Sequence, residues 1–536
     1  MYAATPVAVS SPNPIQLDVI LAIRSRCRGA AINCCMKKRE PFSHVPLKRQ
    51  HGDPSMSKPV ASARPSEGVP RPSDVDDIAL LSALDLVERY RQKTLSPVEV
   101  TRAVLDRIQR LDPVVNAFAV LDAESALSSA RQSEKRWLRG EPAGLVDGVP
   151  VALKDLVLAK GWPTLRGSRA IDPAQEWNED SPATARLREH GAVLLGKTTT
   201  SEFGWKGLGD SPLTGVTRNP WNVAHTPGGS SGGSAVGAAL SFGPLHVATD
   251  GGGSTRLPAA HSGVFGFKPT FGRVPVYPSS QNGTLFHVTP LTRSVRDAAL
   301  LLDVIARPDD RDWHALPPSG FGWSDGQEGG VRGLRVAFSP ALGYAQVDPE
   351  VAQIVADAVK VFSDQGAVVE LADPGIEDPF PIFQTLWFTG AAKLLAELPR
   401  ERRGLTEAGL QAVAEQGAAI DAVSYLQAVD RREALGRHFN GFHRNWDLLV
   451  TPTTAHPASA IDASSEDLKV RPIRSPFTYP FNLTQQPAAS VPAGLTSAGL
   501  PVGLQIIGAK FADQVVLRAA RAFEAARPFA RPNDPS

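Results

Sequence analysis

Two serines of the sequence lie where they could carry out nucleophilic chemistry. Ser230 lies within the glycine-rich stretch 228–233, and Ser254 follows three consecutive glycines at 251–253. Glycine has no Cβ, so a ligand can approach the main chain closely and several N–H groups can point at one atom. Three glycines that end in a serine therefore predict a nucleophilic hydroxyl beside an oxyanion hole, as acyl transfer requires.

A serine hydroxyl is a weak nucleophile at neutral pH and needs a base nearby. Lys154 ends a short apolar run, Val149–Leu153, of the kind found in buried strands. Taken alone, this pattern favours a structural lysine whose amine reaches solvent. If the amine were instead buried, its charged form would be disfavoured and the neutral form could act as a base.

Several linked motifs around these residues resemble the amidase signature family. The resemblance covers about residues 74–526, and it implies an α/β fold with a large central mixed and twisted β-sheet covered by helices on both faces. The motifs that carry it are Gly148–Asp155, Pro227–Ser234, Asp250–Pro258, Gly266–Thr270 and Gly272–Pro275.

The family resemblance also implies roles for individual residues. It places the catalytic base at Lys154, the proton relay at Ser230 after a cis peptide bond, and the acyl-accepting nucleophile at Ser254. The implied reaction is hydrolysis of a carboxylic amide to an acid and an amine, or ammonia, through an acyl-Ser254 intermediate. Anilides, carbamates and esters present a carbonyl to the same groups. The N–H groups of Gly251, Gly252, Gly253 and Ser254 are expected to hold the oxyanion.

The surroundings of the catalytic residues are predicted in the same way. Gly204 and Trp205 fall where the family has a loop that forms a wall of the substrate site. Ser231 is expected to form a hydrogen bond within the site. Asp250 and Arg256 flank the glycine loop and are expected to brace it as a structural ion pair. Because neighbours on a strand face opposite ways, the carboxylate of Asp155 should point away from Lys154.

Other interpretations compete for the same residues. The stretch 228–232 also fits the G-x-S-x-G nucleophile elbow of α/β-hydrolases, with His456 as a later base, but that leaves Lys154 and the second glycine loop unexplained. Neither loop supplies the G-K-[ST] of a phosphate-binding loop. With all three catalytic positions filled, an inactive binding protein on the same fold is disfavoured.

A further alternative is the glutaminase subunit of a glutamyl-tRNA amidotransferase complex, which belongs to the same family. Those subunits carry a Ser-Asn-Leu-Ala-Arg-type segment ahead of a glutamine-binding arginine. The comparable segment here, Gln384–Gly390, has no such match. Its Trp387 and Phe388 suit an apolar substrate better than glutamine.

Composition and net charge limit the kinds of molecule that this protein is expected to bind. The 536 residues carry a formal net charge of +1, which argues against a nucleic acid or a membrane surface as the partner. No apolar run approaches the ~20 residues of a membrane span. The three cysteines all precede Met56, and no metal-binding motif follows, so hydrolysis should need no metal and no cofactor. We expect a cytoplasmic enzyme with a small-molecule amide substrate, and a homodimer is compatible with the sequence.

The chain divides unevenly. Residues 1–73 are rich in Pro, Ser, Ala and basic residues, and we expect a disordered leader or a start-site artefact, with translation naturally starting at Met56. A transit peptide is the alternative. Residues 74–530 should form a single catalytic domain, in which about 379–446 is mainly helical and resembles the family least. Substrate selectivity or oligomer contacts could vary in that region.

A few elements must position the catalytic residues. Strands are predicted at Val149–Leu153, Ala192–Lys197 and Leu245–Thr249, the last of which delivers the triple glycine. A helix is expected to begin at Ser96, because serine caps, Pro97 occupies the first turn and Glu99 reaches back to the cap.

Overall fold

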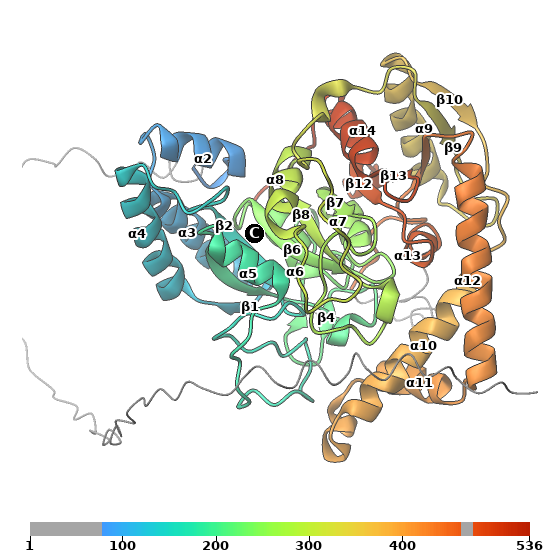
Figure 1. Cartoon of the computed structure of the whole chain (residues 1–536), viewed down its shortest axis with the longest axis horizontal. Coiled ribbons are helices and arrows are strands. Elements are labelled where there is room, and N and C mark those ends of the chain that lie inside the picture. The colour runs from blue at the N-terminus through green and yellow to red at the C-terminus, as the bar shows by residue number, and fades with distance from the viewer. Residues whose placement is uncertain (1–77, 462–474, 536) are drawn as a thin grey trace, which may run out of the picture. The chain divides into compact units, whose positions relative to one another are not determined.

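An 11-stranded sheet runs through the centre of the fold, in the order β1-β3-β2-β6-β8-β7-β12-β13-β11-β9-β10 (Figure 1). The computed structural model describes residues 78–461 and 475–535, all within the unit Val69–Ser536, so the prediction for residues 1–73 lies outside them. The strands of the sheet are β1 (Phe118–Leu121), β2 (Pro150–Lys154), β3 (Val193–Thr198), β6 (Leu245–Asp250), β7 (Phe265–Lys268), β8 (His287–Thr292), β9 (Arg335–Phe338), β10 (Val368–Leu371), β11 (Leu448–Pro452), β12 (Ala488–Leu495) and β13 (Pro501–Gly508). A separate hairpin pairs β4 (Asp210–Ser211) with β5 (Gly215–Val216).

Helices cover the sheet on both faces, and several pack directly on its central strands. The helices are α2 (Ala83–Arg91), α3 (Pro97–Val115), α4 (Ala123–Arg139), α5 (Pro182–Glu189), α6 (Gly232–Ala239), α7 (Arg256–Ser262), α8 (Val295–Ile305), α9 (Pro349–Asp364), α10 (Phe380–Glu397), α11 (Ala408–Ala418), α12 (Ala422–Phe442), α13 (Tyr479–Leu483) and α14 (Asp513–Ala526). Short 3₁₀ helices are η2 (Glu202–Gly204), η3 (Gly283–Leu285), η4 (Gln327–Gly329) and η5 (Arg400–Leu405).

The sheet is mixed, as predicted. β2 is parallel to both β3 and β6, whereas β8 is antiparallel to β6 and to β7. The second half of the chain adds the antiparallel pair β12 and β13 and the parallel neighbours of β9. This mixture of parallel and antiparallel pairs confirms the predicted mixed sheet of an α/β fold. Strands from both halves of the chain belong to the same sheet.

The site depends on the parallel pairing of β2 with β6. Val151 lies opposite Leu245 and Leu153 opposite Val247, so the carboxyl ends of both strands lie at the same edge of the sheet. Lys154 ends β2 and Asp250 ends β6. Loops that follow strand ends at one edge of such a sheet are the usual place for a binding site.

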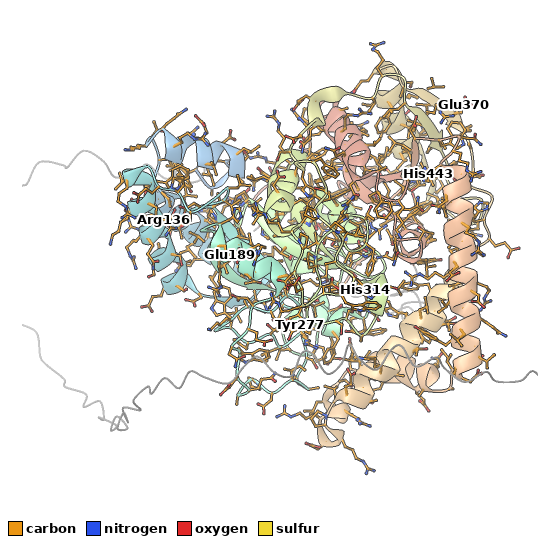
Figure 2. The ribbon with its side chains drawn as sticks, viewed as in Figure 1. Arg136, Glu189, Tyr277, His314, Glu370 and His443 are labelled. Carbon is orange, nitrogen blue, oxygen red and sulfur yellow. The ribbon has the colours of Figure 1, made fainter. Side chains whose placement is uncertain are left out.

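The segment that enters β2 is anchored from α4. Arg136, which Figure 2 shows on this helix, donates from Nε and Nη2 to the two carboxylate oxygens of Asp147 at 2.8 and 2.6 Å. The neighbouring Trp137 indole donates to the Asp147 carbonyl at 3.1 Å. A bidentate pair of this kind fixes geometry as well as charge, so β2 begins from a fixed point.

Local signals set the ends of several helices. α3 begins at Pro97 after the N-cap Ser96, and the reciprocal capping box with Glu99 is present, as predicted. Residues 379–446 fold into α10, η5, α11 and α12, and α10 packs on both α11 and α12 (Figure 1). In the two described stretches, none of the helices has the length and hydropathy needed to cross a bilayer.

Candidate active site

Lys154 is fully buried, and its amine is surrounded by hydroxyl groups. Nζ lies 2.7 Å from Ser230 Oγ, 2.9 Å from Ser231 Oγ and 2.8 Å from Thr249 Oγ1. A lysine amine carries up to three N–H donors, and here each contact is made to a neutral hydroxyl. The lysine therefore does not extend to solvent, and Ser231 forms the hydrogen bond within the site that was predicted for it.

Burial lowers the pKa of Lys154 well below its ordinary value of 10.5, while the negative charge of Asp250 opposes the shift. Asp155 takes no part, because its carboxylate faces the other way and pairs with Lys197 at 3.5 Å. The prediction that Asp155 points away from Lys154 is confirmed. The carboxylate that influences the amine is instead Asp250, at the end of the neighbouring strand.

Ser230 is held between a tight loop and the start of α6. The peptide bond from Gly229 to Ser230 is cis, as the family resemblance implied. A Cβ on Gly229 would lie 2.1 Å from the carbonyl oxygen of Leu208, so only glycine fits where the two backbones meet. Ser230 is 1% exposed, so its hydroxyl faces Lys154 and not solvent.

Ser254 lies beside this relay. The Ser231 N–H donates to the Ser254 carbonyl at 3.1 Å, which joins the two glycine-rich loops. Among the described residues, no hydrogen bond joins the hydroxyls of Ser230 and Ser254. Catalytic hydrogen bonds are often long without substrate and tighten in the complex, so the contact is expected to form when substrate binds.

The loop 251–254 offers fewer oxyanion donors than predicted. The N–H of Gly253 already donates to Asp250 Oδ1 at 2.8 Å, so it does not point into the site as expected. Within residues 78–461 and 475–535, the N–H groups of Gly251, Gly252 and Ser254 have no acceptor. Those three groups remain as candidate donors, and Gly253 serves to brace the loop.

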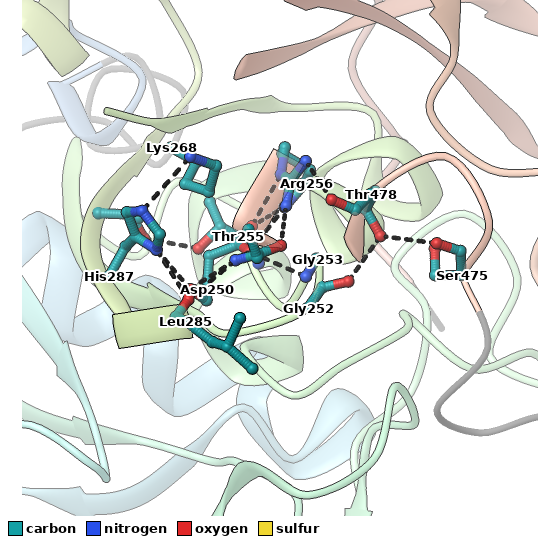
Figure 3. A network of polar contacts seen from close by, with 12 residues as sticks. Asp250, Gly252, Gly253, Thr255, Arg256, Lys268, Leu285, His287, Ser475 and Thr478 are labelled. Carbon is teal, nitrogen blue, oxygen red and sulfur yellow. Dashed lines mark hydrogen bonds and ion pairs between the residues drawn. The ribbon is translucent and has the colours of Figure 1, made fainter. Parts of the chain in front are cut away.

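Asp250 and Arg256 form the predicted ion pair, fully buried beneath the loop (Figure 3). Arg256 Nε and Nη2 donate to the two Asp250 oxygens at 3.0 and 2.9 Å. Burial alone would raise the pKa of Asp250, but the attraction of Arg256 and hydrogen bonds from Arg256 and Asn482 hold it below its usual 3.8. The carboxylate therefore stays charged under the glycine loop.

The same brace includes residues that the sequence did not indicate. Arg256 also donates to the Thr478 carbonyl at 3.0 Å, to Asn482 Oδ1 at 2.7 Å and to Gln505 Oε1 at 2.8 Å. Thr478 Oγ1 in turn donates to the Gly252 carbonyl at 2.7 Å (Figure 3). These partners lie more than 200 residues from the loop, and no local pattern marks them. Thr249 was also missed, although its place one residue before Asp250 could have suggested it.

Ser254 opens on a narrow cavity with aromatic walls. Phe383 of α10 stacks on Trp387 with ring centroids 5.1 Å apart, and the two lie against Gly252 and Gly251 respectively. A larger cavity of about 650 Å³ adjoins it and shares Gly207, Leu257 and Ser475. Besides Ser254 and Leu257, the narrow cavity is lined by Gly204, Trp205, Lys206, Gly207, Gly229, Gly252, Gly253, Phe383, Trp387 and Ser475.

A family model described as Amidase matches residues 99–517 of the chain. The chain belongs to the amidase signature family. It is 35% identical to an acylamidase from Rhodococcus erythropolis over 84% of this chain and 96% of that protein. It is 34% identical to a glutamyl-tRNA(Gln) amidotransferase subunit from Geobacter metallireducens, over 83% and 97% of the two chains.

Solved structures give the same result. The chain superimposes on a bacterial aryl acylamidase of the amidase signature family with a TM-score of 0.79 and 32% identity, covering 84% of this chain and 97% of that one. For the peptide amidase of Stenotrophomonas maltophilia the TM-score is 0.74 at 28% identity, covering 86% and 100%. The chain is thus an enzyme that hydrolyses amide bonds.

The geometry of this amidase argues against the nucleophile elbow. His456 is exposed, and in the described part of the chain its ring forms no hydrogen bond with Ser230 or Ser254. Ser230 instead contacts Lys154. Of the two aromatic residues singled out in 384–390, Trp387 lines the cavity, whereas Phe388 packs in the neighbouring hydrophobic cluster. Its place in the wall is taken by Phe383, one residue before the segment considered.

Proposed function

We propose that this amidase cleaves its substrate through a covalent acyl-Ser254 intermediate. Ser254 Oγ attacks the carbonyl carbon, and the electron pair of the C=O bond moves onto the carbonyl oxygen. The proton leaving Ser254 passes to Ser230 Oγ, whose own proton passes to Lys154 Nζ. The N–H groups of Gly251, Gly252 and Ser254 would then hold the oxyanion, and each such donor is worth about 3–4 kcal/mol in other hydrolases.

The second half of the cycle uses the same groups in reverse. As the C–N bond breaks, Lys154 returns a proton through Ser230 to the departing nitrogen, so that the amine leaves neutral. A water molecule then gives its proton to the same relay, attacks the acyl ester carbon and displaces Ser254. The acid is released and the serine hydroxyl is restored.

The observation that carries this proposal is the contact of 2.7 Å between Lys154 Nζ and Ser230 Oγ, within a cage of hydroxyls. Burial disfavours the ammonium form, as a lysine base requires. Asp250 is held by Arg256 and gives no direct contact to the amine among the described residues. The amine is therefore available to accept a proton from a neighbouring hydroxyl, and of its three hydroxyl neighbours we assign this role to Ser230.

We propose a neutral amide with a flat apolar group as the substrate. The walls formed by Trp205, Phe383 and Trp387 present ring faces and edges to a group bound beside Ser254. The aryl acylamidase among the similar structures supports the same class. In keeping with the sequence, we assign the enzyme a small-molecule substrate and a cytoplasmic location.

The alternative is the glutaminase subunit of an amidotransferase, which several relatives are named for. A site for glutamine would require charged partners for its α-carboxylate and α-amine. The two α10 residues that line the cavity, Phe383 and Trp387, supply none. The ammonium of Lys206, which also belongs to the lining, is already paired with two carboxylates of the protein. We therefore favour a hydrolase of apolar amides over that interpretation.

Ser254→Ala tests the proposal directly. The variant should lose essentially all amide turnover and keep the wild-type melting temperature, whereas the exposed-site control Ser497→Ala should behave as wild type. A fluorophosphonate should add to the wild-type protein once, and peptide mapping should place the adduct on Ser254. Label on Ser230 would overturn the assignment of the nucleophile. Glutamine hydrolysed with a higher kcat/KM than acetanilide would favour the amidotransferase interpretation.

A further inference from the structure

One carboxylate of the mainly helical region 379–446 forms hydrogen bonds with two side chains that line the cavity beside Ser254. Glu407, the N-cap residue of α11, accepts a hydrogen bond at Oε1 from the indole N–H of Trp205. Its Oε2 accepts from Lys206 Nζ at 2.7 Å. Trp205 and Lys206 both line the cavity that contains Ser254. Glu407 does not line it and acts on the wall from behind.

The backbone at Glu407 is itself fixed. The backbone N–H of Glu407 donates to Glu202 Oε2 at 2.8 Å, and Ser168 donates to the other oxygen of Glu202 at 2.6 Å. The first turn of α11 lies so close to the Trp205 indole that a Cβ on Gly409 would be 2.9 Å from its ring. The start of α11 and the wall loop are therefore packed as one unit.

The opposite side of the wall is also fixed. The Trp387 indole donates to the Trp205 carbonyl at 3.2 Å, so the two aromatic walls are joined through the backbone. A change at Glu407 would thus act on a wall that is otherwise well held, and its first effect would be on charge rather than on shape.

Lys206 brings a positive charge to this cavity. Only 8% of its side chain is exposed, and burial disfavours the ammonium, but Asp210 at 2.8 Å and Glu407 together raise its pKa. The ammonium therefore stays charged, and with its two carboxylate partners it forms a group of three charges whose sum is negative. Asp210 is 39% exposed, whereas Glu407 is 19% exposed and more strongly shielded from solvent. Both carboxylates raise the pKa of Lys206, Asp210 the more, and Glu407 is the one of the two that also holds the wall residue Trp205.

We infer that Glu407 is a specificity-determining, positioning residue, which keeps the cavity selective for neutral amides by adding a second negative charge beside Lys206 and by holding Trp205. This inference rests on the proposed function. Without the Glu407 carboxylate, Lys206 and Asp210 form a pair of zero net charge, so substrates that carry a negative charge near the scissile bond are no longer repelled. With the Glu407 carboxylate present, an anionic substrate finds no favourable charge in the cavity and still loses its hydration shell on binding.

Glu407→Gln tests the inference, because glutamine keeps the length and the oxygen acceptor for Trp205 but removes the charge. Acetanilide and para-acetamidobenzoate form a matched substrate pair that differs by one carboxylate. We expect the ratio of kcat/KM for the anionic over the neutral amide to rise about fivefold at low ionic strength, and less at high salt. The matched control is Glu397→Gln, which breaks an exposed ion pair with Lys393 on α10.

Two further measurements separate a charge effect from a structural one. In Lys206→Met/Glu407→Gln the rise should be absent, since the ammonium is gone. Labelling of Ser254 by a neutral and by an anionic phosphonate needs no amide turnover. In Glu407→Gln the ratio of the anionic to the neutral labelling rate should rise by the same factor as the ratio of kcat/KM. An unchanged ratio in Glu407→Gln, with or without a lower melting temperature, overturns the inference. A wild-type protein that hydrolyses neither amide overturns the proposed function instead, and the labelling ratio still decides the role of Glu407.

Discussion

Burial decides the chemistry of a single residue in this amidase. Lys154 could not serve as a base with an ordinary pKa, because almost all of it would be protonated at neutral pH. Its place at the end of β2 removes the amine from water, and its three hydroxyl neighbours solvate the neutral amine without a compensating charge. The opposing influence of Asp250 is limited because Arg256 neutralises that carboxylate.

The pH dependence of turnover should therefore report Lys154. Because its pKa is lowered by burial, kcat/KM for a neutral amide should rise with pH through an apparent pKa below the ordinary lysine value of 10.5. Lys154→Ala should remove this limb and lower kcat by about 10³-fold or more. Lys154→Arg should be nearly as inactive, since arginine stays protonated. The control is Lys393→Arg at an exposed position, and a Lys154→Arg enzyme with near-normal turnover would refute the base assignment.

At the scale of elements, the glycine loop is shaped by a helix from the far end of the sequence. Thr478, the N-cap residue of α13, donates to the Gly252 carbonyl, and a Cβ on Gly253 would lie 2.1 Å from its Oγ1. The contact fixes the peptide plane that follows Gly252. The direction of the neighbouring N–H groups, and hence the oxyanion hole, depends on it.

Thr478→Val should separate positioning from binding. Valine keeps the shape but removes the hydroxyl, so the Gly252 carbonyl loses its donor and the loop loses a fixed orientation. We expect kcat to fall about tenfold with little change in KM, and the free energy of unfolding to fall by about 1 kcal/mol. Thr478→Ser should restore kcat. The matched control is Thr484→Val, which removes a buried hydroxyl at the other end of α13 and should leave kcat unchanged.

At the scale of the whole molecule, the central sheet carries a buried histidine that makes the fold sensitive to acid. His246 of β6 is fully buried, and in the described residues neither ring nitrogen has a hydrogen-bond partner. Burial, with a smaller effect of the Arg293 charge, lowers its pKa from 6.5 to about 3. The unfolded chain therefore binds a proton below pH 6.5 that the folded chain does not, and stability falls as the pH decreases.

His246→Leu should relieve this sensitivity. Between pH 7.5 and pH 5 the histidine should cost the folded state about 2 kcal/mol, and the leucine variant should lose that much less over the same interval. Urea denaturation of both proteins at the two pH values measures the difference, and every other titrating group is common to them. Equal losses in the two proteins would show that His246 is protonated in the folded state.

The sequence allowed the residues to which we assign catalytic roles to be located, because their signals are local. Lys154, Ser230 and Ser254 each lie in a short glycine-rich or strand-end motif, and the strand that ends at Lys154 was marked by an apolar run. The capping box at Ser96 is equally local and equally well predicted. These features depend on neighbours within a few residues, which a pattern reports directly.

The rest of the site depends on pairings across the sheet, and those could not be predicted. Thr478, Asn482 and Glu407 belong to ordinary helix ends, and only the order of β7, β12 and β13 in the sheet and the packing of α10 on α11 bring them to the loop and the wall. The hydrogen bond from the Gly253 N–H to Asp250 is local, but it was missed because residue types alone do not set the direction of a glycine N–H within a loop.

The contact between Arg256 and Gln505 has a consequence for the growing polypeptide. The residues proposed as nucleophile, relay and base are all synthesised by residue 254, but the brace of the glycine loop lacks its Gln505 contact until β13 emerges and joins the sheet. We expect amide cleavage to begin only after this last strand has joined the sheet, because the loop that carries Ser254 is held in part from β13.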